Sequence, residues 1–102
     1  MKNSNEVDIL YTLNEIIKER SRCEDCDSSY VASLMKRGTC RCAQKFGEEA
    51  VELVISVSSN SSYSESVGEA ADVLFHYMVL LQSSKIEFSH VLEELVKRNQ
   101  QK

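Results

Sequence analysis

The fold is decided by SYSESVGEAADVLFHYMVLLQ, residues 62–82, in which apolar side chains occur on nearly every side of a predicted helix. Ser62 and Glu65 have the spacing of a capping box at the start of this helix. A helix that is apolar all round is typical of a buried central element. We therefore expect it to form the centre of the fold, with Glu69 and Asp72 buried.

The remainder of the chain also predicts helices. It has no proline and three glycines, and its apolar residues recur every three or four positions rather than alternating. Four further helices are predicted over residues 6–20, 30–37, 40–57 and 87–98. Gly38 ends the second of these, and Thr39 is the predicted N-cap of the next. The sequence thus predicts a single all-α domain over residues 1–102, with four to five helices in an antiparallel bundle.

Composition limits the partners and the compartment. The 102 residues include 16 acidic and 12 basic side chains, for a net charge of −4. This balance argues against nucleic acid and against anionic membrane as partners. No segment has the roughly 20 apolar residues of a membrane span, and the start MKNSNEVD is too polar for a signal peptide, so we expect a cytoplasmic protein. A core this small favours a homo-oligomer, most simply a homodimer formed through the central apolar helix.

Two groups of carboxylates stand out on the predicted helices. Glu48, Glu49 and Glu52 share a narrow arc of one helix, and Glu69 and Asp72 share a face of the next. Bringing these acids together in a cleft requires protons or a cation to neutralise them. Oxygen ligands favour Mg²⁺ or Mn²⁺ over zinc. The alternative is that the glutamates of the first group form only the solvated face of an amphipathic helix.

The acidic pattern resembles a known signature. E-E-x-x-E, sixteen residues and then E-x-x-D is similar to the motif of the all-α nucleotide pyrophosphohydrolase superfamily. Further strings resemble one family within it, the phosphoribosyl-ATP pyrophosphohydrolases: SSYVASLMKRG (28–38), KFGEEAVELVIS (45–56), EAADVLFHYMVLL (69–81) and VLEELVKR (91–98). The resemblance covers nearly the whole chain. The S-Y-x-x-x-L element, Lys45 and the D-x-L-x-H string make it specific to this family.

The resemblance implies a phosphoribosyl-ATP diphosphatase, which hydrolyses phosphoribosyl-ATP to phosphoribosyl-AMP and pyrophosphate in the second step of histidine biosynthesis. It implies metal ligands at Glu49, Glu52, Glu69 and Asp72. It also implies catalytic roles for Glu48 and Glu49, with Glu48 binding a second ion or orienting water. Two alternatives stay open: a pyrophosphatase that removes unwanted free nucleotides, and a non-catalytic helical interaction module whose acids are surface charge.

Basic residues are needed for so anionic a substrate. Lys45 lies one helical turn before Glu49 and could reach a phosphate oxygen. Further candidates lie at or near predicted helix ends, where cations also simply suit the helix dipole: Arg20, Lys36, Arg37 and Arg98. His76 follows Asp72 by one turn, and it could hydrogen-bond a metal ligand from behind or be a core histidine.

The four cysteines have no counterpart in the resemblance. They form two close pairs, Cys23-x-x-Cys26 and Cys40-x-Cys42. The quartet could hold a structural zinc ion that ties a loop to a helix. Free thiols are the favoured alternative in a reducing compartment.

Overall fold

The computed structural model describes residues 4–22 and 29–101, which form five helices and no strand. The helices are α1 (Ser4–Ser21), α2 (Tyr30–Arg37), α3 (Thr39–Ser58), α4 (Tyr63–Ser83) and α5 (Phe88–Gln100). The predicted all-α class is confirmed, and each predicted helix is present with its ends shifted by no more than two residues. None of the described helices is long and apolar enough to cross a membrane.

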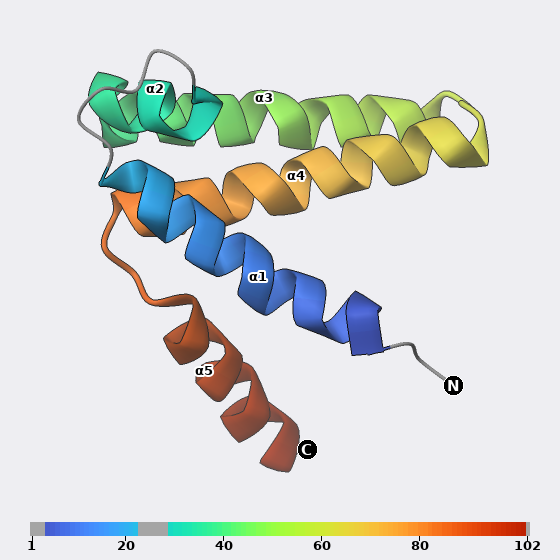
Figure 1. Ribbon diagram of the computed structural model, residues 1–102. Coiled ribbons are helices and arrows are strands. Elements are labelled where there is room, and N and C mark those ends of the chain that lie inside the picture. The colour runs from blue at the N-terminus through green and yellow to red at the C-terminus, as the bar shows by residue number, and fades with distance from the viewer. Residues whose placement is uncertain (1–3, 23–28, 102) are drawn as a thin grey trace.

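Helices α3 and α4 form a long antiparallel hairpin, which Figure 1 shows running across the width of the molecule. The predicted capping box is present at the start of α4. The hydroxyl of Ser62 accepts from the Glu65 backbone at 3.1 Å, and the Glu65 carboxylate accepts from the Ser62 backbone at 3.2 Å. Caps of this kind contribute about 1 kcal/mol. The box fixes where α4 begins and so places Glu69 within its second turn.

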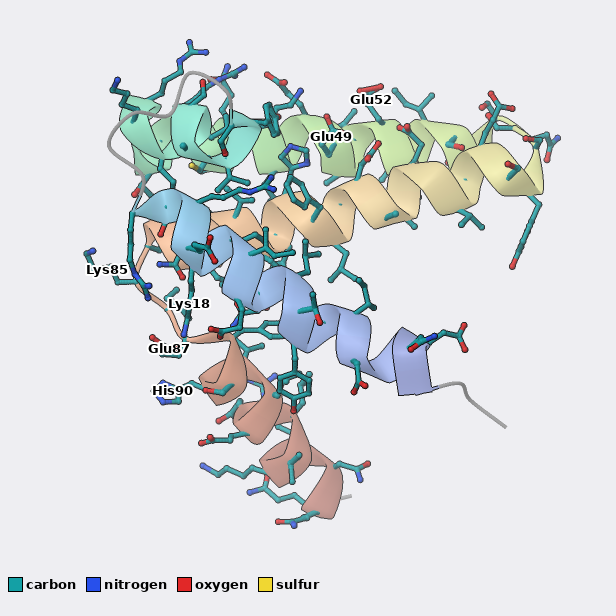
Figure 2. All side chains as sticks on the ribbon, in the orientation of Figure 1. Lys18, Glu49, Glu52, Lys85, Glu87 and His90 are labelled. Atoms are coloured by element: carbon teal, nitrogen blue, oxygen red, sulfur yellow. The ribbon has the colours of Figure 1, made fainter. Side chains whose placement is uncertain are left out.

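The core lies at one end of this hairpin. There α2 packs beside the start of α3, α1 crosses the second half of α4, and α5 follows the end of α4 (Figure 1). The buried apolar side chains are Ile17, Val31, Ala32, Leu34, Cys42, Met78, Val79, Leu81 and Phe88. An ion pair of 3.0 Å between Lys18 of α1 and Glu87, just before α5, adds a link between these two helices (Figure 2).

The prediction that α4 is buried on all sides was wrong for the single chain. Its buried residues all lie between His76 and Leu81, whereas Val67 and Leu74 before them are 50% and 43% exposed. The reason is that α1 and α5 reach only the second half of α4, so α3 is the neighbour of its first half. Consequently Asp72 is exposed and Glu69 is half-buried, where both were expected to be buried.

A single glycine separates α2 from α3. Gly38 has a φ of +96°, which favours glycine because it has no Cβ, and its N–H donates to the Met35 carbonyl at 3.1 Å. The prediction of Thr39 as N-cap was wrong, because Gly38 occupies that position and Thr39 is already helical. The Thr39 hydroxyl instead donates to the Ser83 carbonyl at 3.0 Å. This bond ties the start of α3 to the end of α4.

Candidate active site

Three glutamates from two helices form a carboxylate cluster. Glu49 and Glu52 lie one turn apart on α3 and Glu69 lies opposite them on α4, with one carboxylate oxygen from each within 4.8 Å of the others. Glu49 is only 8% exposed, whereas Glu52 is exposed. Figure 2 shows Glu49 and Glu52 on the same stretch of α3. The antiparallel hairpin therefore brings together three of the acids that the sequence singled out.

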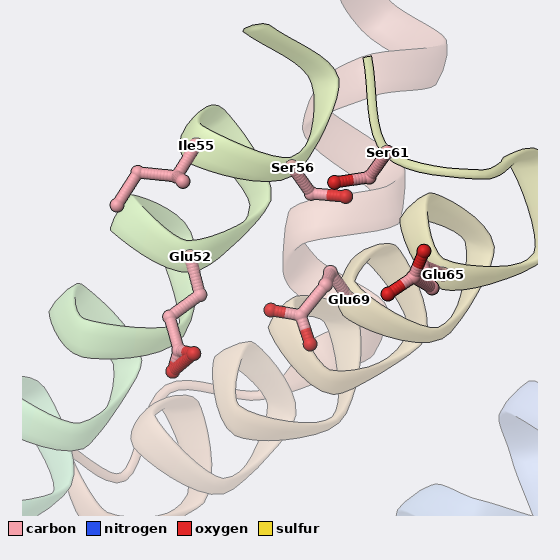
Figure 3. Close-up of a pocket in the computed structure, with 6 residues that line it drawn as sticks. All are labelled: Glu52, Ile55, Ser56, Ser61, Glu65 and Glu69. Atoms are coloured by element: carbon pink, nitrogen blue, oxygen red, sulfur yellow. The ribbon is translucent and has the colours of Figure 1, made fainter. Parts of the chain in front are cut away.

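A groove lies beside the carboxylate cluster and is lined by two of its members, Glu52 and Glu69. It has a volume of about 300 Å³ and lies between α3 and the start of α4. Figure 3 shows its lining residues: Glu52, Ile55, Ser56, Ser61, Glu65 and Glu69. The hydroxyls of Ser56 and Ser66 lie 2.8 Å apart across the same helix pair. The acids thus stand at the edge of a polar hollow open to solvent.

The carboxylates repel one another. Burial raises the pKa of Glu69 above its ordinary value, and the charges of Glu52, Asp72 and Glu49 raise it further. A raised pKa means that the negative form of Glu69 is disfavoured in the folded chain. A cation would relieve this repulsion, and an all-oxygen donor set with an open side suits a hard divalent cation such as Mg²⁺. The residues present therefore fit the metal that the sequence pattern implies.

Lys45 is the cation nearest to the carboxylate cluster. Its Nζ lies 3.2 Å from a Glu49 oxygen and 3.8 Å from a Glu48 oxygen. The contact with Glu49 is the main cause of the raised pKa of Lys45. The structure thus brings the predicted phosphate-binding lysine directly to the acids.

Sequence reasoning missed Arg41. It lies one turn before Lys45 on α3, and its Nη1 is 3.6 Å from a Glu48 oxygen. Arg41, Lys45 and Glu48 are spaced four and three residues apart, so they share a helical face. That spacing was visible in the sequence and could have identified this arginine.

His76 is a buried core histidine whose ring also forms a hydrogen bond with the side chain of Tyr30. Its Nδ1 lies 2.9 Å from the backbone carbonyl of Asp72, which can only accept, so this nitrogen donates. Its Nε2 therefore accepts from the hydroxyl of Tyr30, at 2.8 Å. Burial raises the pKa of Tyr30, whose hydroxyl also feels the charges of Lys45 and Glu49. The contact of His76 is thus with the Asp72 backbone rather than with a ligand carboxylate.

Other predicted site residues lie further from the cluster of three. Glu48 is exposed and pairs with Arg41 and Lys45, and Asp72 is exposed one turn beyond Glu69. The remaining basic candidates are all exposed: Arg20 near the end of α1, Lys36 and Arg37 at the end of α2, and Arg98 on α5. Arg98 pairs with Glu94 at 2.9 Å. The substrate contacts of these four stay predictions.

The cysteine quartet is only half described. Cys23 and Cys26 lie outside the described residues. Cys42 is buried in the apolar core, with its Sγ 3.6 Å from the Leu34 carbonyl, and Cys40 is exposed. Cys40 and Cys42 form no disulfide and lie in different surroundings, and the choice between free thiols and a shared zinc site stays a prediction.

Comparisons with known proteins agree with the carboxylate pattern. The family model described as phosphoribosyl-ATP pyrophosphohydrolase matches residues 10–99. A phosphoribosyl-ATP pyrophosphatase of Novosphingobium aromaticivorans is 46% identical over 91 residues, which cover 89% of this chain and 83% of that protein.

Longer relatives match as well. The histidine biosynthesis bifunctional protein HisIE of Buchnera aphidicola from Acyrthosiphon pisum is 39% identical over 100 residues, covering 98% of this chain and 46% of the relative. The HisIE protein of Escherichia coli K12 is 40% identical over 91 residues, covering 89% and 44%. This chain therefore spans less than half the length of these bifunctional relatives. The match over nearly its whole length shows that the chain belongs to the phosphoribosyl-ATP pyrophosphohydrolase family.

Proposed function

We propose that this chain hydrolyses phosphoribosyl-ATP to phosphoribosyl-AMP and pyrophosphate, the second step of histidine biosynthesis. Water adds to the α phosphorus of the triphosphate and releases a proton to solvent, the bond from that phosphorus to the oxygen bridging the α and β phosphates breaks, and pyrophosphate leaves with the bonding electron pair. The observation that carries the proposal is the meeting of Glu49, Glu52 and Glu69 within 4.8 Å beside Lys45. Membership of the family and the names of its relatives support it.

In this proposal Glu49, Glu52 and Glu69 would hold a magnesium ion, with Asp72, whose charge helps to raise the pKa of Glu69, as the fourth ligand. When bound, Mg²⁺ supplies charge neutralisation for the phosphates and lowers the pKa of a coordinated water. Mn²⁺ has the same preference for oxygen and would fit the same residues.

The chain's own residues then do the positioning. Lys45 binds a phosphate oxygen, because it already lies against the metal-binding face and exchanges its contact with Glu49 for one with substrate. Glu48 is half-exposed beside Glu49 and either orients the attacking water or holds a second ion. Arg20, Lys36, Arg37 and Arg98 are the further candidates for phosphate contacts, some of them from a second subunit.

A homodimer is part of the proposal. Exposed apolar side chains cover the part of the α3–α4 hairpin that the other helices leave bare: Val51, Val54, Ile55, Val57, Val67 and Leu74. A second copy packed on this surface would bury it and complete the helical layers. Sedimentation at micromolar concentration should give the mass of two chains. A monomer that retains full activity would contradict this assembly.

Substrate profiling tests the proposed function against its main alternative. Pyrophosphate release is measured with phosphoribosyl-ATP, ATP and a set of other free nucleotides, each with excess Mg²⁺. We expect phosphoribosyl-ATP to be cleaved far more efficiently than any free nucleotide. Equal efficiency with ATP would replace this function by removal of unwanted free nucleotides.

A further inference from the structure

Arg41 extends the charged face of α3 beyond Lys45. The two cations both reach Glu48, with Nη1 of Arg41 at 3.6 Å and Nζ of Lys45 at 3.8 Å, and Lys45 also reaches Glu49 at 3.2 Å. Two cations, Arg41 and Lys45, therefore precede the acids along one face of α3. An anionic ligand lying along this face would meet the metal-binding acids at one end and an arginine at the other.

The guanidinium of Arg41 has hydrogen-bond donors that no described residue accepts from. Among the residues that the structure describes, its side chain makes no hydrogen bond, and its Nε is buried without an acceptor. Its ion pair with Glu48, at 3.6 Å, is longer than the 2.7–2.9 Å typical of a charge-assisted hydrogen bond. A guanidinium carries five N–H donors. The buried Nε is out of a ligand's reach, so the Nη donors of Arg41 are the ones available to a ligand that brings its own oxygen atoms.

The substrate of the proposed function has two anionic ends. One is the triphosphate, and the other is the phosphate of the second ribose, attached to the adenine ring. The carboxylate cluster and Lys45 serve the triphosphate end. The backbone of Arg41 lies eight residues, or about 12 Å, before that of Glu49 along the helix axis, and its guanidinium contacts Glu48, which is outside the carboxylate cluster of Glu49, Glu52 and Glu69. A purine and two sugar rings separate the two ends of the substrate, so its second phosphate needs a cation other than Lys45, outside the carboxylate cluster.

We infer that Arg41 binds the phosphate of the second ribose, an inference that rests on the proposed function. The planar guanidinium fits a phosphate with two parallel hydrogen bonds, which a lysine cannot provide. To bind this phosphate, Arg41 gives up its ion pair with Glu48. The loss costs little free energy, because Glu48 is exposed and exposed ion pairs contribute little to stability. Arg41 thereby distinguishes phosphoribosyl-ATP from ATP.

Binding of two adenine monophosphates tests this assignment. Phosphoribosyl-AMP and AMP both lack the triphosphate and differ only in the ribosyl phosphate. Dissociation constants are measured for the wild-type chain, Arg41→Met and Lys97→Met, which removes an exposed positive charge of α5. We expect Arg41→Met to raise the dissociation constant of phosphoribosyl-AMP by about ten- to a hundredfold and to change that of AMP by no more than about twofold. Lys97→Met should change neither.

Two results would overturn the inference: an equal loss for both ligands, or no loss for either. Arg41→Lys provides a second variant in case the methionine disturbs folding, which circular dichroism would reveal. Arg41→Lys keeps the positive charge but loses the two parallel hydrogen bonds, so it should weaken the binding of phosphoribosyl-AMP alone, and by less than Arg41→Met does. An equal loss of affinity for AMP again overturns the inference. Because binding needs no turnover, a wild-type chain that releases no pyrophosphate defeats the proposed function and is distinguishable from a failure of Arg41.

Discussion

Nζ of Lys45 lies 3.2 Å from a carboxylate oxygen of Glu49, so the predicted phosphate ligand neutralises a predicted metal ligand. The two residues are one turn apart on α3, and Glu49 is nearly buried. Glu49 cannot give its full charge to a metal ion while it holds Lys45. Metal binding and release of Lys45 toward substrate are therefore coupled in the proposed mechanism.

Replacement of Lys45 by methionine should separate these two effects. Mn²⁺ should bind the variant about two- to fivefold more tightly, equivalent to about 0.4–1 kcal/mol, because Glu49 loses its competing cation. Pyrophosphate release should fall at the same time, because a phosphate contact is lost. Titration of Mn²⁺ by electron paramagnetic resonance and a turnover assay measure the two. Weaker Mn²⁺ binding in Lys45→Met would show that the lysine supports the metal site instead of competing with it.

Glu69→Gln should stabilise the metal-free chain at neutral pH. The folded-state pKa of Glu69 is raised above the ordinary 4.5, so its ionised form destabilises the fold above that pKa. This destabilisation disappears as the pH falls through the folded-state pKa. The wild-type melting temperature should therefore approach that of Glu69→Gln as the pH is lowered from 7 toward the ordinary pKa of 4.5, measured in EDTA.

The matched control for this change is Glu93→Gln, which removes an exposed carboxylate from α5. It should leave the melting temperature and metal binding unchanged, whereas Glu69→Gln should abolish most activity. The same loss is expected for Glu49→Gln, Glu52→Gln and Asp72→Asn. Full activity in any two of these four variants would mean that the carboxylates do not form one site.

Tyr30→Phe should destabilise the fold by about 1–3 kcal/mol, because it leaves the buried Nε2 of His76 without its donor. For a domain of this size that corresponds to a melting temperature lower by at least several degrees. Tyr63→Phe removes the same hydroxyl from a side chain that is 87% exposed and should have no effect. Equal melting temperatures for the two variants would contradict the assigned hydrogen bond.

Cys42→Ser should lower the free energy of unfolding by about 1–3 kcal/mol, because it places a hydroxyl in the apolar core. Cys40→Ser should change it by less than about 0.5 kcal/mol, because this thiol is exposed. Urea unfolding measures both, and turnover should persist in each. One zinc ion per purified chain, or an inactive but folded Cys40→Ser variant, would show that the thiols are not free.

The helices and most of the acidic cluster could be predicted from the sequence because their signals are local. Apolar spacing, Gly38 and the Ser62–Glu65 capping box set the helix ends, and the acidic spacing places Glu49 and Glu52 on one face. The exposure of Asp72 could not be predicted, because it depends on which helices reach the first half of α4.

Long-range contacts likewise could not be predicted from the sequence. The hydrogen bond of Tyr30 with His76 joins residues 46 positions apart in the chain, and only the packing of α2 brings them together. Arg41 had a visible helical spacing, but its reach to Glu48 depends on side-chain conformation. Local patterns thus gave the acids, and tertiary packing supplied the groups around them.

The central claim is that the carboxylates of α3 and α4 hold a divalent cation that hydrolysis of phosphoribosyl-ATP requires. The most direct measurement is pyrophosphate release from phosphoribosyl-ATP by the wild-type chain in excess Mg²⁺, in EDTA, and after Mg²⁺ is restored. The account predicts release with Mg²⁺, none in EDTA, and full recovery. Release that continues unchanged in EDTA, or its absence with Mg²⁺ present, would contradict it.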